Sequence, residues 1–284
     1  MRSALVTHCG AGSTPELDGL AREAGTAGMA VLRSRGGALD AVIAAVVALE
    51  DDPRTNAGTG SRLRVDGSLQ MDAGLMDSRR RIGAVAAISK VKNPILVARA
   101  VMDTPHILLA GEGAVRFARK QGFPAFDPAT PRARERLRES LTKLRSGKLP
   151  RWATRWKGFT WDTVGAVARD GRARFAAGSS TGGHAFMLPG RVGDSPLPGG
   201  GFYAGPAGAV TVTGIGEEIA RLVLSKFVYD EIEGGGRAQA ACDAGLALFP
   251  RRISVGIIAV DARGTGEACN RDMAWWGSDR GPGG

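Results

Sequence analysis

The spacing of apolar residues in the first part of the chain predicts a strand followed by two helices. Residues 3–8 form a short apolar run that leads into a turn at 9–12. A second helix, at 38–49, is apolar on nearly all sides, so we expect it to be buried on most faces. The first helix starts near Pro15, with Ser13 or Thr14 as N-cap, and its apolar face consists of Leu17, Leu20, Ala21, Ala24, Gly28, Val31 and Leu32.

Alternating apolar and polar stretches predict three β-hairpins. Residues 62–66 and 68–73 flank Asp66-Gly67, a strong hairpin-turn pair. The same logic predicts a hairpin from 164–168 and 173–177 and another from 253–260 and 266–270. The remaining predicted elements are strands at 83–89 and 209–213 and helices at 94–102, 112–121, 217–232 and 238–248.

The order of these elements favours a layered α+β fold over repeated βαβ units. Antiparallel strands occur in runs, and the helices are grouped between them. Two sheets packed face to face, each covered on the outside by helices, would suit both the buried helix at 38–49 and the strands that are apolar on both faces. We therefore treat residues 1–284 as one domain without internal repeats.

The net charge of +10 is concentrated in one segment. Residues 131–160 contain ten Lys or Arg and two Glu, so about +2 remains for the rest of the chain. Trp152, Trp156, Phe159 and Trp161 interleave with these charges, as in some single-strand nucleic-acid binders. The competing interpretation is a solvated helix and linker, which we favour. Its polar, self-repelling composition predicts that the stretch from about residue 131 to 150 is mobile.

Other features of the composition bear on location. No apolar run reaches the 18 or more residues of a membrane span, and residues 1–6 are too short for a signal peptide. Cys9, Cys242 and Cys269 are odd in number, far apart and lack metal-like spacing. We therefore expect a protein of the reducing cytoplasm with no membrane partner.

Thr163 is a candidate nucleophile at the start of a predicted strand. A threonine hydroxyl is a weak nucleophile and needs a base beside it. If Thr163 becomes an N-terminus, its own α-amine, with a reference pKa of about 7.7–8.0, can take the hydroxyl proton. The Asp162–Thr163 peptide bond must then be broken first, by attack of the same hydroxyl. The alternative is that Thr163 is simply a β-branched residue opening a strand.

Three Gly-rich segments downstream carry further candidate residues. Thr181, in Ser-Ser-Thr-Gly-Gly at 179–183, is placed to hold the Thr163 hydroxyl or amine, although it could be a turn threonine. Thr213 and Gly214 end one strand and open a helix, where a hydroxyl and a backbone N–H can face a developing oxyanion. Gly214 and Gly216 leave room for a substrate, and the competing interpretation of this run is a helix cap.

Arg191 and Asp194 lie three residues apart in a loop rich in Gly and Pro. An Arg fork grips a carboxylate bidentately, and an Asp accepts from an ammonium group. Together they would hold the two charged groups of a free amino acid. The alternative is a plain salt bridge between the two side chains.

These segments together resemble the plant-type L-asparaginase and isoaspartyl peptidase family of N-terminal-nucleophile (Ntn) hydrolases. Residues 7–12 are similar to its N-terminal Gly-rich motif, with Cys9 where glycine is more usual. Residues 49–58 resemble its loop that wraps a sodium ion, in which Asn56 is the asparagine offered to the active site, and residues 104–113 also match. The main-chain ligands implied for a sodium ion are Leu49, Glu50, Thr55, Ala57 and Thr59.

The resemblance implies an αββα four-layer sandwich that cuts itself into residues 1–162 and 163–284. It also implies catalysis by Thr163, Thr181, Thr213 and Gly214 without a cofactor, in a homodimer of αβ units. The substrate-binding residues that it implies are Arg191, Asp194, Gly214, Gly216 and Asn56.

The expected reaction is release of L-aspartate from L-asparagine, from β-aspartyl (isoaspartyl) dipeptides, or from both. Relatives of this type often have glycine before the nucleophile, whereas Asp162 resembles glycosylasparaginases and threonine aspartases. Asp194 argues against the threonine aspartases, while cleavage of glycosylated asparagine stays open. A nucleic-acid binding protein using residues 131–160 is the competing class. A nucleotide-binding module at 9–12 is set aside because the chain lacks G-x-G-x-x-G and G-x-x-x-x-G-K-[ST].

Overall fold

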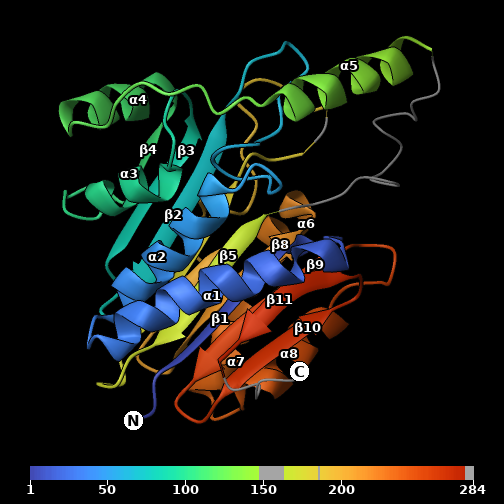
Figure 1. Cartoon of the computed structure of the whole chain (residues 1–284). Helices are drawn as coiled ribbons and strands as arrows, with labels where there is room; N and C mark the ends of the chain where they lie inside the picture. Colours follow the sequence, from blue (N-terminus) through green and yellow to red (C-terminus); the bar gives the residue numbers. More distant parts are fainter. Residues whose placement is uncertain (147–162, 185, 279–284) are drawn as a thin grey trace.

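The computed structural model describes residues 1–146, 163–184 and 186–278 (Figure 1). Asp162 and most of the second half of the basic segment therefore lie outside the described residues. In the described part, a larger sheet has the strand order β11 (Met273–Gly277), β1 (Ala4–Ala11), β5 (Val164–Arg169), β6 (Phe175–Thr181), β2 (Met71–Asp77), β3 (Ile82–Ile88) and β4 (Leu108–Ala110). A smaller sheet has the order β10 (Thr265–Cys269), β9 (Val255–Asp261), β8 (Gly208–Gly214) and β7 (Phe202–Gly205).

Neighbouring strands are antiparallel except for β3 and β4, which pair in parallel. β5 pairs with both β1 and β6, so the strand that follows Thr163 is central in the larger sheet. The helices are η1 (Pro15–Leu17), α1 (Asp18–Arg33), α2 (Ala38–Asp51), α3 (Pro94–Val101), α4 (Gly111–Lys120), α5 (Pro131–Arg145), α6 (Gly216–Leu222), α7 (Leu224–Glu233) and α8 (Ala238–Ala247).

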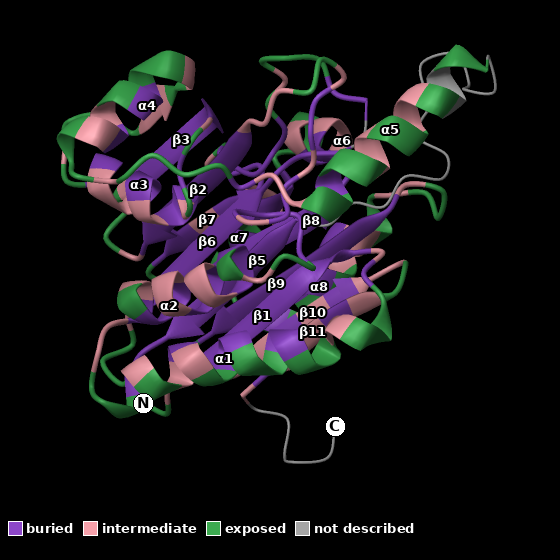
Figure 2. Ribbon diagram, turned by 45° about the horizontal axis from the view of Figure 1, so that its top comes forward, coloured by how far each residue is buried: buried purple, intermediate pink, exposed green. Residues whose placement is uncertain are grey.

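Alternation along the strands sorts the buried side chains into three apolar clusters. One lies between the larger sheet and α1 to α4, and a second lies between the smaller sheet and α6 to α8. The third joins strands of both sheets, through residues such as Val167 of β5 and Ile258 of β9. The buried strands, which are covered by helices with exposed outer faces, are visible in Figure 2. The coarse expectation of a mixed helix and sheet protein is thus confirmed.

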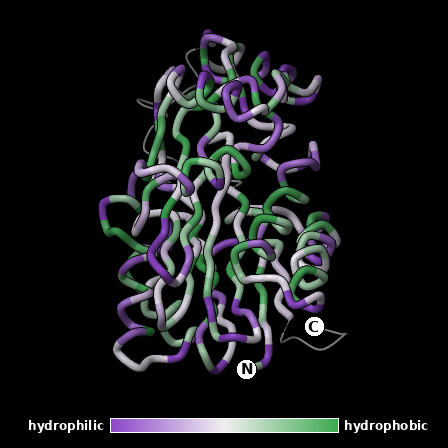
Figure 3. Tube along the Cα trace, turned by 90° about the vertical axis from the view of Figure 1, so that its left-hand side faces the viewer, coloured by the Kyte–Doolittle hydropathy of each residue, from purple (hydrophilic) through white to green (hydrophobic). Residues whose placement is uncertain are grey.

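Polar residues are concentrated where the strands turn. Figure 3 shows hydrophilic stretches in the turns near the N-terminus and more hydrophobic colouring along the interior of the trace. The described residues include no helix that is both long enough and apolar enough to cross a membrane.

The predicted hairpin at 62–66 and 68–73 is wrong. Its turn exists, since the Gly67 N–H donates to the Arg64 carbonyl at 3.0 Å, but residues 62–66 are not a strand. The Arg64 side chain is fully buried, and the Val65 N–H donates to the Met187 carbonyl at 3.2 Å. Polar and apolar residues alternate here because the segment packs against the loop that contains Met187. The strand β2 begins only at Met71 and pairs with β3 and β6.

The other two predicted hairpins are confirmed as β5–β6 and β9–β10. The predicted helix at 217–232 is divided into α6 and α7 at Val223, whose φ of 49° is left-handed. A β-branched residue rarely adopts that conformation, and no glycine marks the break. The sequence pattern therefore reads as one continuous helix.

The first half of the basic segment forms helix α5. Most of its described side chains are exposed, while Ala133 is buried. This is the solvated helix favoured from composition, and the mobility of residues 131–150 stays a prediction.

Candidate active site

The space between the two sheets changes from apolar to polar along the strands. On β5, Val167 belongs to the apolar cluster between the sheets, so Gly165 and Thr163 lie on the same face. On β6, Phe175 and Ala177 belong to that cluster, and Ser179 and Thr181 follow on the same face. At this end the sheets therefore enclose hydroxyl groups in place of apolar side chains.

Thr163 and Thr181 meet on this face. The Thr163 hydroxyl donates to the Thr181 hydroxyl oxygen at 3.3 Å, and both residues are buried, at 6% and 3% exposure. The Gly183 N–H also donates to the Thr181 hydroxyl oxygen, at 3.0 Å. Thr181 is therefore held by its own loop and can orient the Thr163 hydroxyl.

The smaller sheet faces this pair with two threonines of β8. The Thr211 side chain lies against Gly165 of β5, since a Cβ on Gly165 would lie 2.9 Å from Thr211 Oγ1. Thr213, two residues further along β8, lies on the same face, and its Oγ1 accepts the Ala11 N–H at 3.2 Å. The structure thus brings Thr213 to the end of the sandwich at which β5 begins.

Gly214 and Gly216 are both required by close packing. Gly214 has a φ of 140°, and a Cβ there would lie 2.2 Å from the Ser254 carbonyl oxygen. A Cβ on Gly216 would lie 2.6 Å from Asp194 Oδ1 and 3.0 Å from Arg191 Nη2. Gly216 therefore marks the point where the two charged groups of the predicted clamp converge.

Arg191 is paired with a residue that the sequence analysis did not assign. Its Nε and Nη2 donate to the two carboxylate oxygens of Glu217, each at 2.9 Å. The alternative of a salt bridge between Arg191 and Asp194 is therefore not the arrangement found. Asp194 is 3% exposed, and its Oδ2 has no hydrogen-bond partner among the described residues.

The acidic groups around Arg191 differ in protonation. Burial, together with the nearby Glu217 and Asp72 charges, raises the pKa of Asp194 to about 7, against the attraction of Arg191. Burial also acts to raise the pKa of Glu217, but the hydrogen bonds and charge of Arg191 outweigh it and lower that pKa. In the free protein, the Glu217 carboxylate therefore pairs with the Arg191 guanidinium. Burial favours the protonated form of Asp194, which has no cationic partner of its own in the described part of the chain.

Asn56 ties its loop to the strand end that carries Thr181. Its side-chain Nδ2 donates to the Gly183 carbonyl, and its backbone carbonyl oxygen accepts the Gly182 N–H at 2.7 Å. The Asn56 side-chain oxygen accepts the Arg62 N–H at 2.9 Å. Asn56 therefore shapes the rim of the site.

Sequence reasoning missed four further side chains at this end, three of them buried and Glu217 partly exposed. Asp72 lies opposite Thr181 in the β2–β6 register, and Asp72 and Thr181 therefore share a face. His8 is fully buried beside Gly165, and burial lowers its pKa to about 3, although the Thr163 backbone acts in the opposite direction. The Met187 sulfur accepts from Arg64 Nη1 at 3.1 Å and lies 3.7 Å from Arg191 Nη1. Glu217 could have been found from its place directly after the Gly-rich run, whereas the other side chains converge only in three dimensions.

Comparisons with known proteins show the family to which the chain belongs. The sequence pattern of the family described as Asparaginase matches residues 1–281. The chain belongs to the asparaginase family. The resemblance noted from the sequence is thus confirmed.

The chain is 44% identical over 279 residues to a protein of Pyrococcus abyssi (strain GE5 / Orsay) named plant-type L-asparaginase, covering 92% of this chain and 90% of that protein. It is 37% identical over 302 residues to a Danio rerio protein named isoaspartyl peptidase/L-asparaginase, covering 99% and 94%. A Homo sapiens protein of that same name is 42% identical over 246 residues, covering 85% and 79%. Both names thus occur among proteins that this member of the family resembles over most of its length.

Proposed function

We propose that this protein is a threonine amidohydrolase that releases L-aspartate from L-asparagine, from β-aspartyl dipeptides, or from both. The observation that carries the proposal is the contact between the Thr163 and Thr181 hydroxyls, at 3.3 Å, in a site where Arg191 and Asp194 converge at Gly216. Family membership and the names of the relatives support the same reaction.

The first half of the reaction acylates Thr163. The freed α-amine of Thr163 takes the hydroxyl proton as the oxygen attacks the side-chain amide carbon of the substrate. The Thr213 hydroxyl and the Gly214 N–H stabilise the negative charge that develops on the carbonyl oxygen. Breakdown of this intermediate breaks the C–N bond, the α-amine returns the proton to the departing nitrogen, and a β-aspartyl ester remains on Thr163.

The second half hydrolyses that ester. Water attacks the same carbonyl carbon and gives a proton to the α-amine, which passes it to the departing Thr163 oxygen. Free L-aspartate leaves, and the threonine is restored. Thr181 orients the Thr163 hydroxyl before acylation, through the contact described above.

The clamp selects an α-amino acid group on the substrate. Arg191 has one edge on Glu217, and its remaining donors at Nη1 and Nη2 can bind the substrate carboxylate. Asp194, with its unpartnered Oδ2, accepts from the substrate ammonium group. A nearby cation stabilises the charged carboxylate, so substrate binding should lower the pKa of Asp194 from about 7.

The three candidate substrate classes differ only in their leaving group. The clamp does not contact the leaving group, so an assay must decide between them. Purified, processed protein should be assayed against L-asparagine, a β-aspartyl dipeptide and a glycosylated asparagine. We expect L-aspartate from one or both of the first two substrates. Turnover of the glycosylated substrate alone would favour the glycosylasparaginase alternative, and no L-aspartate from any substrate would refute the proposal.

We also infer the finer architecture that the family resemblance implies. The three apolar clusters support an αββα four-layer arrangement of the Ntn-hydrolase type. Self-cleavage before Thr163 would then give fragments that stay associated, because β1 and β5 pair across the cut. We propose that such αβ units form homodimers. The odd number and wide sequence spacing of the cysteines support a reducing, cytoplasmic location, which we also propose. Sedimentation analysis of the processed protein tests the dimer.

We further propose that the loop after α2 holds a structural sodium ion, with no role in the chemistry. The carbonyl oxygens of Leu49 and Ala57 both lie near Thr55 Oγ1, at 2.8 and 3.3 Å, so they converge. The Glu50 carbonyl accepts the Thr59 N–H at 2.8 Å, which closes the same loop. Carbonyl oxygens suit a hard cation. The expected ligands stay Leu49, Glu50, Thr55, Ala57 and Thr59, and exchange of sodium for a larger cation should lower the melting temperature.

A further inference from the structure

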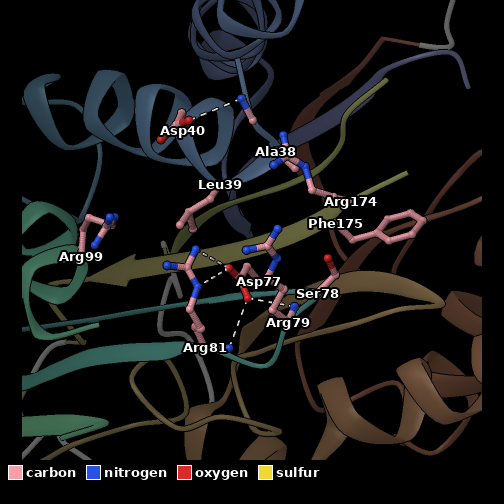
Figure 4. Close-up of a pocket in the computed structure, with 11 residues that line it drawn as sticks. Ala38, Leu39, Asp40, Asp77, Ser78, Arg79, Arg81, Arg99, Arg174 and Phe175 are labelled. Carbon is pink, nitrogen blue, oxygen red and sulfur yellow. Dashed lines mark hydrogen bonds and ion pairs between the residues drawn. The ribbon is translucent and has the colours of Figure 1, made fainter. Parts of the chain in front are cut away.

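A cavity lined by arginines lies at the opposite end of the strands from Thr163. Its volume is about 180 Å³, and it is bounded by the start of α2, the β2–β3 turn and the β5–β6 turn (Figure 4). Phe175 of β6 lines it, six residues before Thr181, which places the cavity roughly 20 Å from the candidate active site. One ordered water needs only about 10–15 Å³, so there is room for a small polyatomic ligand.

Two of the arginines are fixed by hairpin turns of the same construction. In each turn an Asp side chain accepts the N–H groups two and four residues later, and the Nε of the Arg four residues later donates to its other oxygen. Asp77 holds Arg81 in this way at 2.8 Å, and Asp170 holds Arg174 at 2.7 Å. Both carboxylates therefore use their oxygens for hydrogen bonds within their own turns, and these bonds fix the guanidinium groups of Arg81 and Arg174.

Several arginine N–H groups around the cavity do not donate to any protein acceptor among the residues that the structure describes. Arg174 uses only Nε on Asp170, and its Nη2 would lie 3.4 Å from a Cβ on Gly37 at the start of α2. Arg99 reaches the cavity from α3, and its Nη1 is paired at 2.6 Å with Asp103, which does not line the cavity. Arg79 has no side-chain ion pair or hydrogen bond among the described residues, and Figure 4 shows its guanidinium on the cavity side.

The carboxylates that face this cluster do not use up those donors. Asp77 and Asp170 are occupied as described, and Asp170 also accepts the Ala38 N–H at 3.3 Å. Asp40 accepts the Gly37 N–H at 3.3 Å. The lining residues alone comprise four arginines, Arg79, Arg81, Arg99 and Arg174, and two aspartates, Asp40 and Asp77.

We propose that this cavity, named here the arginine pocket, binds a small oxyanion that carries a phosphoryl or carboxylate group. Planar guanidinium groups bind such anions through paired, charge-assisted hydrogen bonds. Because the four arginines come from two turns and a helix, a bound anion would link these three elements. The pocket is separate from the Arg191 fork, and its occupancy does not depend on the proposed hydrolysis.

Calorimetric titration of the full-length protein with inorganic phosphate tests the pocket, and titration with succinate distinguishes the two ligand classes. The informative variant is the double substitution Arg79→Gln with Arg99→Gln, which leaves the two hairpin turns intact. The matched control is Arg138→Gln with Arg221→Gln, which removes two equally charged arginines from exposed ion pairs elsewhere. Arg191→Ala separates the pocket from the active site.

We expect phosphate or succinate affinity to fall about tenfold or more in the pocket variant, since two charge-assisted contacts are lost. The control variant should bind both anions as the wild-type protein does. Arg191→Ala should bind phosphate as the wild-type protein does and should lose only the succinate held by the active-site guanidinium. Tighter binding of phosphate assigns a phosphoryl ligand, and tighter binding of succinate assigns a carboxylate. Absence of binding, equal loss in the control variant, or loss of phosphate binding in Arg191→Ala would overturn the proposal.

Discussion

Arg191 donates from Nε and Nη2 to the two carboxylate oxygens of Glu217, each at 2.9 Å. The Arg191 side chain is only 15% exposed, so this contact fixes the guanidinium against the start of α6. Asp194 Oδ1 and Arg191 Nη2 are both close to the position that a Cβ on Gly216 would occupy. The pairing with Glu217 thus holds Arg191 so that its other edge and Asp194 approach the same small space.

Arg191→Ala should abolish turnover while the fold and self-cleavage persist, because the substrate carboxylate loses its partner and Glu217 is left unpaired at some cost in stability. A loss of at least about a hundredfold in kcat/KM is expected for removal of a buried bidentate contact. The double variant Arg191→Ala with Glu217→Gln is the control, since it removes the carboxylate left without its partner. It should regain stability and stay inactive. Wild-type kcat/KM in Arg191→Ala would contradict the clamp.

Gly216→Ala should reduce substrate binding without unfolding the protein. The new Cβ enters the space between Asp194 and Arg191, while the residue lies in the first turn of α6, where alanine is tolerated. KM for L-asparagine should rise at least about tenfold, and the melting temperature should fall only slightly, because the closest atom, at 2.6 Å, belongs to the Asp194 side chain, which can shift. Gly214→Ala is the contrast, because its Cβ would meet the Ser254 backbone at a φ of 140°. Gly214→Ala should lower the melting temperature, and equal behaviour of the two variants would contradict these separate roles.

The pKa of Asp194 predicts a pH dependence of stability. A folded-state pKa of about 7, above the ordinary 3.8, favours the protonated side chain. Stability from this group is therefore complete below about pH 4 and is lost as the pH rises through about 7, by at most roughly 4 kcal/mol. Glu50, whose pKa burial raises to about 8, contributes in the same direction. Urea unfolding of wild-type protein and Asp194→Asn across this range isolates the Asp194 part, and parallel pH profiles would contradict it.

Local patterns predicted much of the fold because the strands and helices follow their own periodicity. The hairpin β5–β6 and the helices α1 to α4 are examples. The strands β7 and β11 were missed because each has only a few residues, and the pairing of β1 with β11 joins distant parts of the chain. Short strands of this kind are specified mainly by their tertiary partners.

The residues of the candidate site that lie in a local sequence motif could be predicted. Those that only tertiary packing brings to the site could not. Thr163 and Thr181 lie in recognisable segments, and the structure brings them into contact. Asp72 comes from β2 and reaches the site through its register with Thr181. Arg191 and Glu217 are 26 residues apart in the sequence and meet only through the fold. No local sequence pattern predicts such a pair.

The basic segment should be dispensable for hydrolysis. Its composition is polar and self-repelling, and α5 contacts the rest of the protein through few buried residues, among them Ala133. Deletion of residues 138–150, which spares Ala133, should leave kcat/KM unchanged. Loss of folding on this deletion would show that the segment packs. The same variant lacks four of the ten basic residues of the segment, so nucleic-acid binding through phosphate contacts would weaken on deletion and would fall steeply with salt.

Self-cleavage between Asp162 and Thr163 is the central claim, because Thr163 needs a free amine to act as its own base. Thr163→Ala should give a folded, uncut and inactive protein. Thr163→Ser should still cut, more slowly. These outcomes would show that cleavage and activity both depend on the hydroxyl at residue 163.

Intact-mass analysis of aged, active wild-type protein tests the claim most directly. The expected result is two fragments, residues 1–162 and 163–284, that co-elute under native conditions and separate on denaturation. An active enzyme found only as the uncut 284-residue chain would contradict the account.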